Sequence, residues 1–162
     1  MNAYFTQIDA GVEKAYSVGK KARAKGFDPE VDVPVPLAKD MAERVEGIIS
    51  SVCPQLAGSG LAQRMKDLGA EIGDLDWRVA LQIALEVAEE KFCSFSSKLQ
   101  AMETGIRVGI AYLTLGIVAS PLEGFVELRT NSTADGKEYF SLMYSGPIRS
   151  AGGTAAAVSV IV

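Results

Sequence analysis

The stretch VGIAYLTLGIVA (Val108–Ala119) is apolar almost all round. A helix without a polar face lies inside a protein rather than on its surface. Upstream, Ser97-Lys98-Leu99-Gln100 is a capping-box pattern, which predicts that the helix begins near residue 98. Pro121 and Gly124 end it downstream. We therefore predict a helix over about 98–118 that is the most buried helix of the fold.

Other segments carry apolar residues at three- and four-residue steps, which is the period of an amphipathic helix. These segments are 2–25, 38–52, 60–70 and 76–92. In 38–52 the apolar face is predicted to hold Met41, Val45, Ile48 and Val52. In 76–92 the residues predicted to point inward are Trp77, Ala80, Leu81, Ala84, Val87 and Ala88.

The pattern changes after residue 124. Residues 125–130 and 138–144 alternate between apolar and polar side chains, and the turn-forming NSTADGK separates them. This predicts a β-hairpin. The glycine-rich SGPIRSAGGTA (Ser145–Ala155) follows and leads into a final apolar run. The predicted fold class is α+β: a mainly helical N-terminal lobe, then a β-hairpin, then a glycine-rich turn into a helix.

Two domains are predicted. Residues 1–36 form a basic helix followed by an extended acidic linker, because the prolines of FDPEVDVPVP (Phe27–Pro36) exclude a helix there. Residues 37–162 form the helical and β-hairpin domain. The chain ends on the apolar VSVIV without a polar cap, so we expect this domain to be truncated at its C-terminus.

The composition limits the chemistry. Hydrophobic residues make up 48% of the 162 residues, which excludes a wholly disordered chain, and the net charge of −4 argues against unaided binding to nucleic acid. There is no histidine, and Cys53 and Cys93 are the only cysteines, so four-ligand zinc sites and Ser-His nucleophiles are excluded. Both cysteines are expected to be buried in a reducing compartment. No signal peptide or membrane span is apparent, which predicts a cytoplasmic protein.

The glycine-rich turn allows two interpretations. Free N–H groups at a helix start, glycines that permit close approach and one nearby arginine suit a phosphate. The residues that would bind it are Arg149, Ser150, Gly152, Gly153 and Thr154. Alternatively, the glycines only let a helix pack closely against a sheet, with Thr154 or Ser150 as N-cap. A nucleotide P-loop is excluded, because its spacing and lysine are absent.

Charged clusters also have two interpretations each. Lys20, Lys21 and Arg23 can contact phosphates, or they complement the helix dipole at the end of the first helix. Asp74 and Asp76 can share a metal ion, but capping the next helix explains them more simply. Glu86, Glu89 and Glu90 are expected to form a solvated face.

Longer strings carry a family resemblance. GIVASPLEG (Gly116–Gly124), YSGPIRSAGGTA (Tyr144–Ala155) and the opening YFTQIDAGVEKAYSVGKKARAKGFDP resemble the large subunit of archaeal family D DNA polymerase. The resemblance covers essentially the whole chain. It implies a helical lobe with a KH-like α/β module, at the N-terminus of the polymerising half of a two-subunit replicative enzyme.

The resemblance also implies separate roles for the two subunits. The small subunit is a 3′–5′ exonuclease, and the polymerase active site, with Mg²⁺-binding aspartates, lies further along the large chain. This segment is then expected to lack catalysis and cofactors, and to serve folding, subunit assembly and contact with DNA within the full-length protein. The sequence leaves self-association of the segment open. The alternatives are a stand-alone phosphate-ligand-binding domain and a protein-interaction domain without nucleic acid.

Overall fold

The computed structural model describes residues 2–27, 37–115, 121–146, 148 and 153–162. The chain divides into two compact units, Met1–Lys39 and Asp40–Val162. The predicted linker over Phe27–Pro36 lies outside the described residues, apart from Phe27. We describe each unit by itself.

The first unit contains one helix, α1 (Asn2–Ala24). Lys21 and Arg23 occupy its last turn, where cations interact favourably with the helix dipole. Gly26 follows with φ of +73°, a left-handed conformation that ends the helix. The prediction of a helix with a basic end is confirmed.

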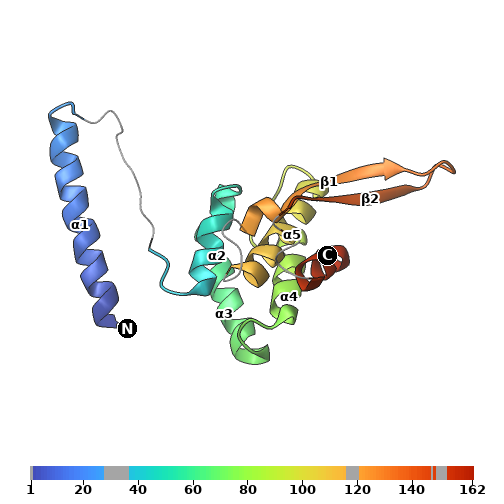
Figure 1. Ribbon diagram of the computed structural model, residues 1–162, viewed down its shortest axis with the longest axis horizontal. Helices are drawn as coiled ribbons and strands as arrows, with labels where there is room; N and C mark the ends of the chain where they lie inside the picture. Colours follow the sequence, from blue (N-terminus) through green and yellow to red (C-terminus); the bar gives the residue numbers. More distant parts are fainter. Residues whose placement is uncertain (1, 28–36, 116–120, 147, 149–152) are drawn as a thin grey trace. The chain divides into compact units, whose positions relative to one another are not determined.

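The second unit is α+β, as the sequence predicted (Figure 1). Its helices are α2 (Met41–Ser50), η1 (Pro54–Leu56), α3 (Leu61–Ile72), α4 (Trp77–Ala88), α5 (Lys98–Thr114), η2 (Pro121–Gly124) and α7 (Gly153–Ile161). Its strands are β1 (Phe125–Ser132) and β2 (Glu138–Tyr144). None of the helices in the described residues is long and apolar enough to cross a bilayer.

Helix α5 is the centre of this unit, and its burial confirms the first prediction. One side of α5 gives Val108, Ala111 and Tyr112 to a core cluster shared with α2, α3 and α4. Another side gives Ile106 and Ile110 to a second cluster with the hairpin residues Phe125 and Leu128. Because α5 takes part in both clusters, it joins the helical lobe to the hairpin.

Helices α4 and α5 pack with almost no side chain between them. A Cβ atom placed on Gly105 would lie 2.4 Å from the carbonyl oxygen of Ala84, and one on Gly109 would lie 3.2 Å from the Ala84 Cβ. Only glycine fits at such a distance, since real Cβ atoms do not approach a backbone oxygen so closely. These glycines therefore set the separation of the two helices.

Capping groups define where the helices of the lobe begin. Asp40 accepts the Glu43 N–H at the start of α2, and Ser97 accepts the Gln100 N–H at the start of α5. The capping-box prediction is thus confirmed for α5. Helix α3 is capped from a distance: the Glu46 carboxylate accepts N–H groups of Gly58 and Ala62, each at 2.8 Å. Glu46 thereby ties the end of α2 to the start of α3.

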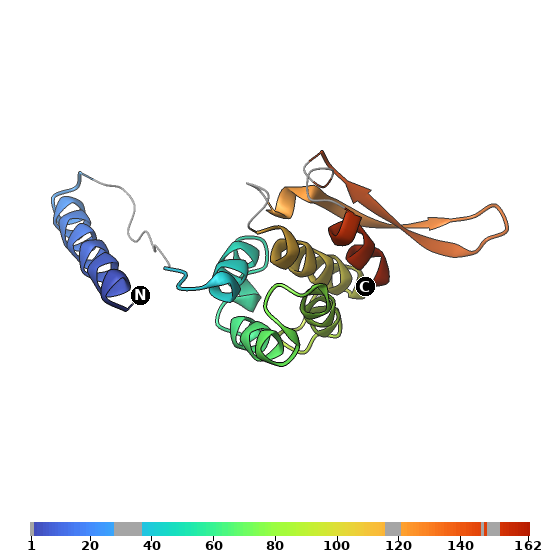
Figure 2. The same cartoon turned by 60° about the horizontal axis from the view of Figure 1, so that its bottom comes forward.

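Strands β1 and β2 form the predicted antiparallel hairpin, with Leu128 opposite Leu142 and Thr130 opposite Phe140. A bulge interrupts the register between Phe125 and Glu127. At its base the hairpin packs on α5, and beyond that it extends past the helices, as Figures 1 and 2 show. The hairpin thus has a supported base and an exposed outer half.

Some predicted core positions are wrong. Trp77 is 47% exposed and Val52 is 56% exposed, although the helical period placed both on apolar faces. Trp77 is the first residue of α4 and Val52 follows the end of α2, so both lie where the helix no longer faces the lobe. The positions that α4 buries instead include Val79 and Ile83. Cys53 is buried as expected, but Cys93 is only half-buried.

The predicted solvated face of α4 is wrong for Glu86, which is 5% exposed. Its carboxylate accepts two hydrogen bonds from the Arg64 guanidinium, with Nη2 at 2.8 Å from Oε1 and Nε at 3.0 Å from Oε2, and one from Gln82. The hydrogen bonds from Arg64 lower the pKa of Glu86 below its usual value. The buried charge is therefore paired by a cation of another helix, which helical spacing alone does not reveal.

We predict that Gly105→Ala destabilises the second unit by about 1–3 kcal/mol, because the new methyl group forces α4 and α5 apart. Gly47→Ala in α2 is the matched control, since nothing lies within 4 Å of a Cβ placed there. It should leave stability unchanged or raise it by up to about 1 kcal/mol. Urea unfolding followed by circular dichroism measures both. Equal stability of the Gly105→Ala variant and the wild type would contradict the packing described.

Candidate functional site

The predicted phosphate-binding turn is described only at its end. Helix α7 begins at Gly153, and Gly153 and Thr154 are both exposed. Arg149, Ser150 and Gly152 lie outside the described residues. The first N–H groups of a helix have no partner within the helix itself, which suits either interpretation of the turn. Its role as an anion site stays a prediction.

Helix α7 is held at the base of the hairpin by one buried polar contact and by apolar packing. The Ser159 hydroxyl donates to the Ala156 carbonyl oxygen at 2.7 Å, so the Tyr144 hydroxyl, 2.5 Å away, donates to Ser159. Val158 is buried and lies against Gly109 of α5. The position of the helix start is therefore fixed by β2 and α5 together.

A hollow of about 610 Å³ lies beside the start of α7. It is lined by Trp77, Gly153, Thr154, Ala157, Val158 and Ile161. None of these lining residues is charged, and Trp77 and Ile161 are 47% and 59% exposed. Among the described residues, its lining is therefore uncharged and mainly apolar.

The basic candidates lie on α1. Lys20 and Lys21 are exposed, and Arg23 is half-buried with its guanidinium beside Gly19. They belong to the first unit, whereas Gly153 and Thr154 belong to the second. The two sets of candidates are therefore described separately, and their role in binding stays a prediction.

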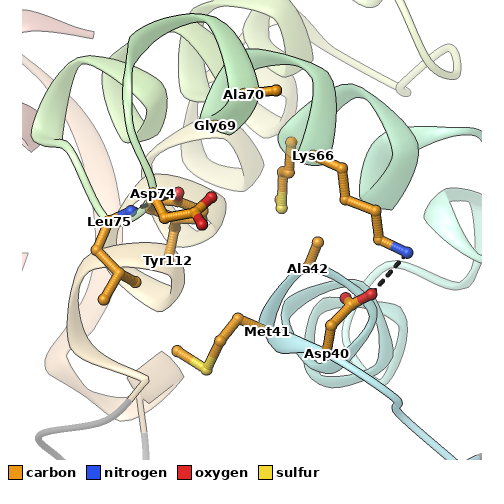
Figure 3. Close-up of a pocket in the computed structure, with 10 residues that line it drawn as sticks. Asp40, Met41, Ala42, Lys66, Gly69, Ala70, Asp74, Leu75 and Tyr112 are labelled. Atoms are coloured by element: carbon orange, nitrogen blue, oxygen red, sulfur yellow. Dashed lines mark hydrogen bonds and ion pairs between the residues drawn. The ribbon is translucent and has the colours of Figure 1, made fainter. Parts of the chain in front are cut away.

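Sequence reasoning missed a groove between α2 and α3, shown in Figure 3. Its volume is about 510 Å³, and Met65, Gly69 and Ala70 of α3 line one side while Met41 and Ala42 of α2 line the other. The wall is apolar because the apolar faces of two amphipathic helices meet there. Met41 was predicted to lie on the buried apolar face of residues 38–52. Its side chain is instead 38% exposed and lines the groove.

Charged groups border the groove at Asp40. The Lys66 ammonium lies 2.7 Å from Asp40 Oδ2 and 3.1 Å from Glu43 Oε1. Burial raises the pKa of the Asp40 carboxyl, but the Glu43 N–H and Lys66 outweigh it and hold the pKa below the usual value. The hydrogen bonds to Asp40 and Glu43 raise the pKa of Lys66. Asp40 and Lys66 are therefore both charged at neutral pH.

A leucine in an unusual conformation borders the groove on another side. Leu75 has a φ of +62° and is 61% exposed. The Tyr112 hydroxyl accepts the Leu75 N–H at 3.1 Å, which holds the turn in place, and the Asp74 carboxylate lies beside Gly69 (Figure 3). Left-handed non-glycine residues cost energy and often mark binding surfaces. The arrangement leaves an apolar side chain and a carboxylate exposed beside the groove.

The two carboxylates considered for a metal have different environments. Asp76 is the N-cap of α4 and accepts hydrogen bonds from the Arg78 N–H and guanidinium, which confirms the capping interpretation for this residue. Asp74 instead lies over Gly69. Within the described ranges, no group of three histidine, cysteine, aspartate or glutamate side chains is placed to hold a metal ion.

The hydrogen bonds from Arg78 lower the pKa of Asp76 from 3.8 to about 2. Since the folded value is depressed, the stability that this group contributes is present above about pH 4 and is lost as the pH falls toward 2. We predict that an NMR titration of the Asp76 carboxyl carbon has its midpoint near 2. In Arg78→Gln the midpoint rises but stays below 3.8, because the backbone N–H of residue 78 still donates.

The control for this titration is Lys91→Gln, which removes a cation paired with Glu89 and should leave the Asp76 midpoint unchanged. An Arg78→Gln protein with the same Asp76 midpoint as the wild type would show that the guanidinium does not cause the shift.

Nearly the whole chain is similar to known proteins of one family. Residues 3–162 match the family described as "DNA polymerase II large subunit DP2, N-terminal". The DNA polymerase II large subunit of Nanoarchaeum equitans is 44% identical over 158 residues, 98% of this chain and 13% of that protein. Those of Thermococcus kodakarensis and Pyrococcus furiosus are 44% and 45% identical over 100% and 98% of this chain.

The match covers nearly all of this chain but only a small part of each relative. The chain spans 9% to 13% of the length of these three relatives. An identity above 40% across nearly the whole chain confirms the resemblance found in the sequence strings. The chain belongs to the family of N-terminal regions of DNA polymerase II large subunits.

Proposed function

We propose that this chain is the N-terminal domain of the large subunit of a replicative DNA-directed DNA polymerase, family D, and that it has no catalytic activity of its own. It serves folding of the subunit, assembly with a small 3′–5′ exonuclease subunit and placement of DNA, in the cytoplasm. The observation that carries the proposal is a match to polymerase large subunits over 98–100% of this chain and only 9–13% of theirs. Transfer of deoxynucleotides to a primer 3′ end, with Mg²⁺, belongs to residues outside these 162.

The ion pairs of three carboxylates support a structural role for these residues. Polymerisation with Mg²⁺ needs carboxylates free to bind metal ions. Asp76 is engaged by Arg78, Asp40 by Lys66, and Glu86 by Arg64. Each of these carboxylates stabilises a helix start or a helix pair. They are structural residues in this domain.

Exposed apolar groups support a role in assembly. The groove between α2 and α3 is bordered by Met41 and Leu75, and the hollow beside α7 is bordered by Trp77 and Ile161. Neighbouring exposed apolar side chains around a hollow are typical of protein–protein contact sites. The small subunit and the rest of the large subunit are the partners that we assign to these two surfaces.

Basic residues are the basis for the DNA part of the proposal. Lys20 and Lys21 are exposed on α1, and Arg23 follows two residues after Lys21. Cations on one helix end bind a phosphate backbone without reading sequence. Arg149, which precedes α7, is the second proposed backbone contact. A protein-interaction domain without DNA contact is the rival, and the exposed apolar surfaces fit it equally well.

The first test concerns catalysis. The purified chain is mixed with a primer–template, deoxynucleotides and Mg²⁺, and primer extension is followed on a denaturing gel. We predict no extension at any concentration of the chain, because the polymerase active site lies outside it. Extension that co-purifies with the chain and scales with its concentration would overturn the proposal of a non-catalytic domain.

The second test concerns DNA. We predict that the chain binds duplex DNA weakly and that the affinity falls steeply with salt. Changing Lys20, Lys21 and Arg23 to glutamine should lower the slope of log affinity against log salt by about 2–3. The matched control changes Lys91, Arg129 and Lys137, which are already paired with carboxylates, and should change the slope little. Fluorescence anisotropy over a salt series measures the slopes.

Equal slopes for the α1 variant and the wild type, with Arg149→Ala also unchanged, would remove DNA from the proposal. The chain would then be a protein-interaction domain of the polymerase.

A further inference from the structure

The fold brings the two cysteines of the chain together, although they lie 40 positions apart in the sequence. Cys53 is 4% exposed and belongs to the core cluster of the helical lobe, and the half-buried Cys93 packs against the same cluster. Val52, the residue before Cys53, lines one hollow with Gln100 and Thr104 of α5. The end of α2 therefore lies beside the start of α5, and Cys93 belongs to the loop that leads into α5.

Hydrogen bonds link the two thiols. The Cys53 thiol donates to Gln55 Oε1 at 3.2 Å, so its sulfur is left as an acceptor. Burial raises the pKa of the Cys93 thiol, and the adjacent Cys53 thiol raises it further, in part through a hydrogen bond between the two side chains. Because the single proton of Cys53 is directed to Gln55, Cys93 is the donor of that bond. The two sulfur atoms are therefore neighbours.

The backbone that carries each thiol is held by hydrogen bonds of its own. The Cys53 N–H donates to the Ile49 carbonyl oxygen at 2.8 Å. In the loop that contains Cys93, the Phe95 N–H donates to Glu90 Oε1 at 2.7 Å. Glu90 itself has a φ of +60°, a left-handed conformation that turns the chain out of α4. The contact between the thiols therefore joins two ordered segments of the lobe.

The two thiols differ in their access to solvent. Cys93 is half-buried and Cys53 is buried, so a small oxidant reaches Cys93 first. Hydrogen peroxide is small and neutral, which suits a sulfur that a bulky disulfide oxidant reaches poorly. The reactive form of a cysteine is the thiolate, and the raised pKa of Cys93 keeps this form scarce. The pair therefore stays reduced until peroxide accumulates.

We propose that Cys53 and Cys93 are a peroxide-sensitive modification site that closes into an internal disulfide. The Cys93 thiolate attacks one oxygen of hydrogen peroxide, the O–O bond breaks, and the released hydroxide takes up a proton to become water. The Cys53 thiolate then attacks the sulfur of the Cys93 sulfenic acid, whose hydroxyl group leaves as a second water. Peroxide thus accepts the two electrons and two protons that the two thiols lose.

The new bond stabilises the helical lobe. It closes a loop from residue 53 to residue 93 that contains η1, α3 and α4. A disulfide restricts the unfolded chain, and this effect grows with the length of the closed loop. Reduction by a dithiol reverses the step. Cys53 and Cys93 thus make the stability of the lobe depend on the redox conditions.

The inference goes beyond the proposed function and fails independently of it. A chain whose thiols do not react with each other can still belong to a polymerase, and the disulfide requires neither DNA nor a small subunit. The experiments below contain neither, so their outcome concerns only the two cysteines.

Peptide mapping of the oxidised wild-type chain tests the bond directly. Peroxide is raised to the concentration that oxidises the exposed Met41 and Met143, catalase stops the reaction, and remaining thiols are blocked with N-ethylmaleimide in denaturant. We expect a monomer on a non-reducing gel that carries no maleimide on Cys53 or Cys93. After trypsin, peptides 45–64 and 92–98, which contain the two cysteines, should be linked and should separate on reduction.

Two single variants test the order of the steps. In Cys53→Ala the Cys93 sulfenic acid has no partner, so dimedone, which captures sulfenic acids, should label Cys93 at least about tenfold more than in the wild type. In Cys93→Ala the buried Cys53 should remain a thiol that maleimide reaches only after unfolding. The mapping of the wild-type chain does not depend on how well either variant folds.

Thermal unfolding measures the consequence. The oxidised wild-type chain should melt about 5–15 °C above the reduced chain, and dithiothreitol should remove the difference. Cys93→Ala exposed to the same peroxide is the matched control. It keeps all five methionines, which peroxide also oxidises, but it cannot form the bond. Its melting temperature should not rise.

Recovery of both cysteines as maleimide adducts overturns the proposal, and so does Cys93 recovered as a sulfinic or sulfonic acid without the link. A disulfide that joins only separate chains, or an oxidised chain that melts no higher than the reduced one, also overturns it. Linked peptides 45–64 and 92–98 in a monomer, with a melting temperature that rises in the wild type and not in Cys93→Ala, support it.

Discussion

The close approach of α4 and α5 is the constraint on which the rest of the second unit depends. Gly105 and Gly109 face Ala84 and Ala88, so the backbones of the two helices meet without intervening side chains. This contact leaves the remaining faces of α5 free for other elements. One face packs with α2, α3 and α4, and another packs with the hairpin. A single helix thus supports two clusters, each too small to be stable by itself.

Charged side chains then fix the elements around that helix. Glu46 ties α3 to α2, Arg64 ties α3 to Glu86 of α4, and Glu103 and Arg107 tie β1 to α5. Each pair joins two elements and satisfies groups that would otherwise be unpaired in a half-buried place. Lys66 likewise ties α3 to Asp40 and Glu43 beside the groove. The groove and the hollow beside α7 are the surfaces to which we assign partners.

Much of the fold could be predicted from local patterns. The capping box at Ser97, the all-apolar α5 and the NSTADGK turn each depend on neighbours in sequence, and the structure has all three. The burial of Glu86 and the cap from Glu46 could not be predicted, because their partners lie 22 and 12–16 residues away and no local period reports them. Trp77 was wrongly predicted to be buried, because the helical period identifies the apolar face of a helix but does not show how far along that face the packed neighbouring helices extend. The candidate site stays a prediction, since Arg149, Ser150 and Gly152 lie outside the described residues and the α1 cations belong to another unit.

Helix α5 takes part in both hydrophobic clusters of the second unit. We infer that α5 couples these two clusters, so that the second unit unfolds as one cooperative body. Native-state hydrogen exchange in increasing denaturant tests this claim most directly. The account predicts that slow amides of α4, α5 and α7 share one opening free energy, equal to that of global unfolding. If the amides of α7 and the hairpin base opened at a much lower free energy than those of α4, the clusters would be independent and the account would be contradicted.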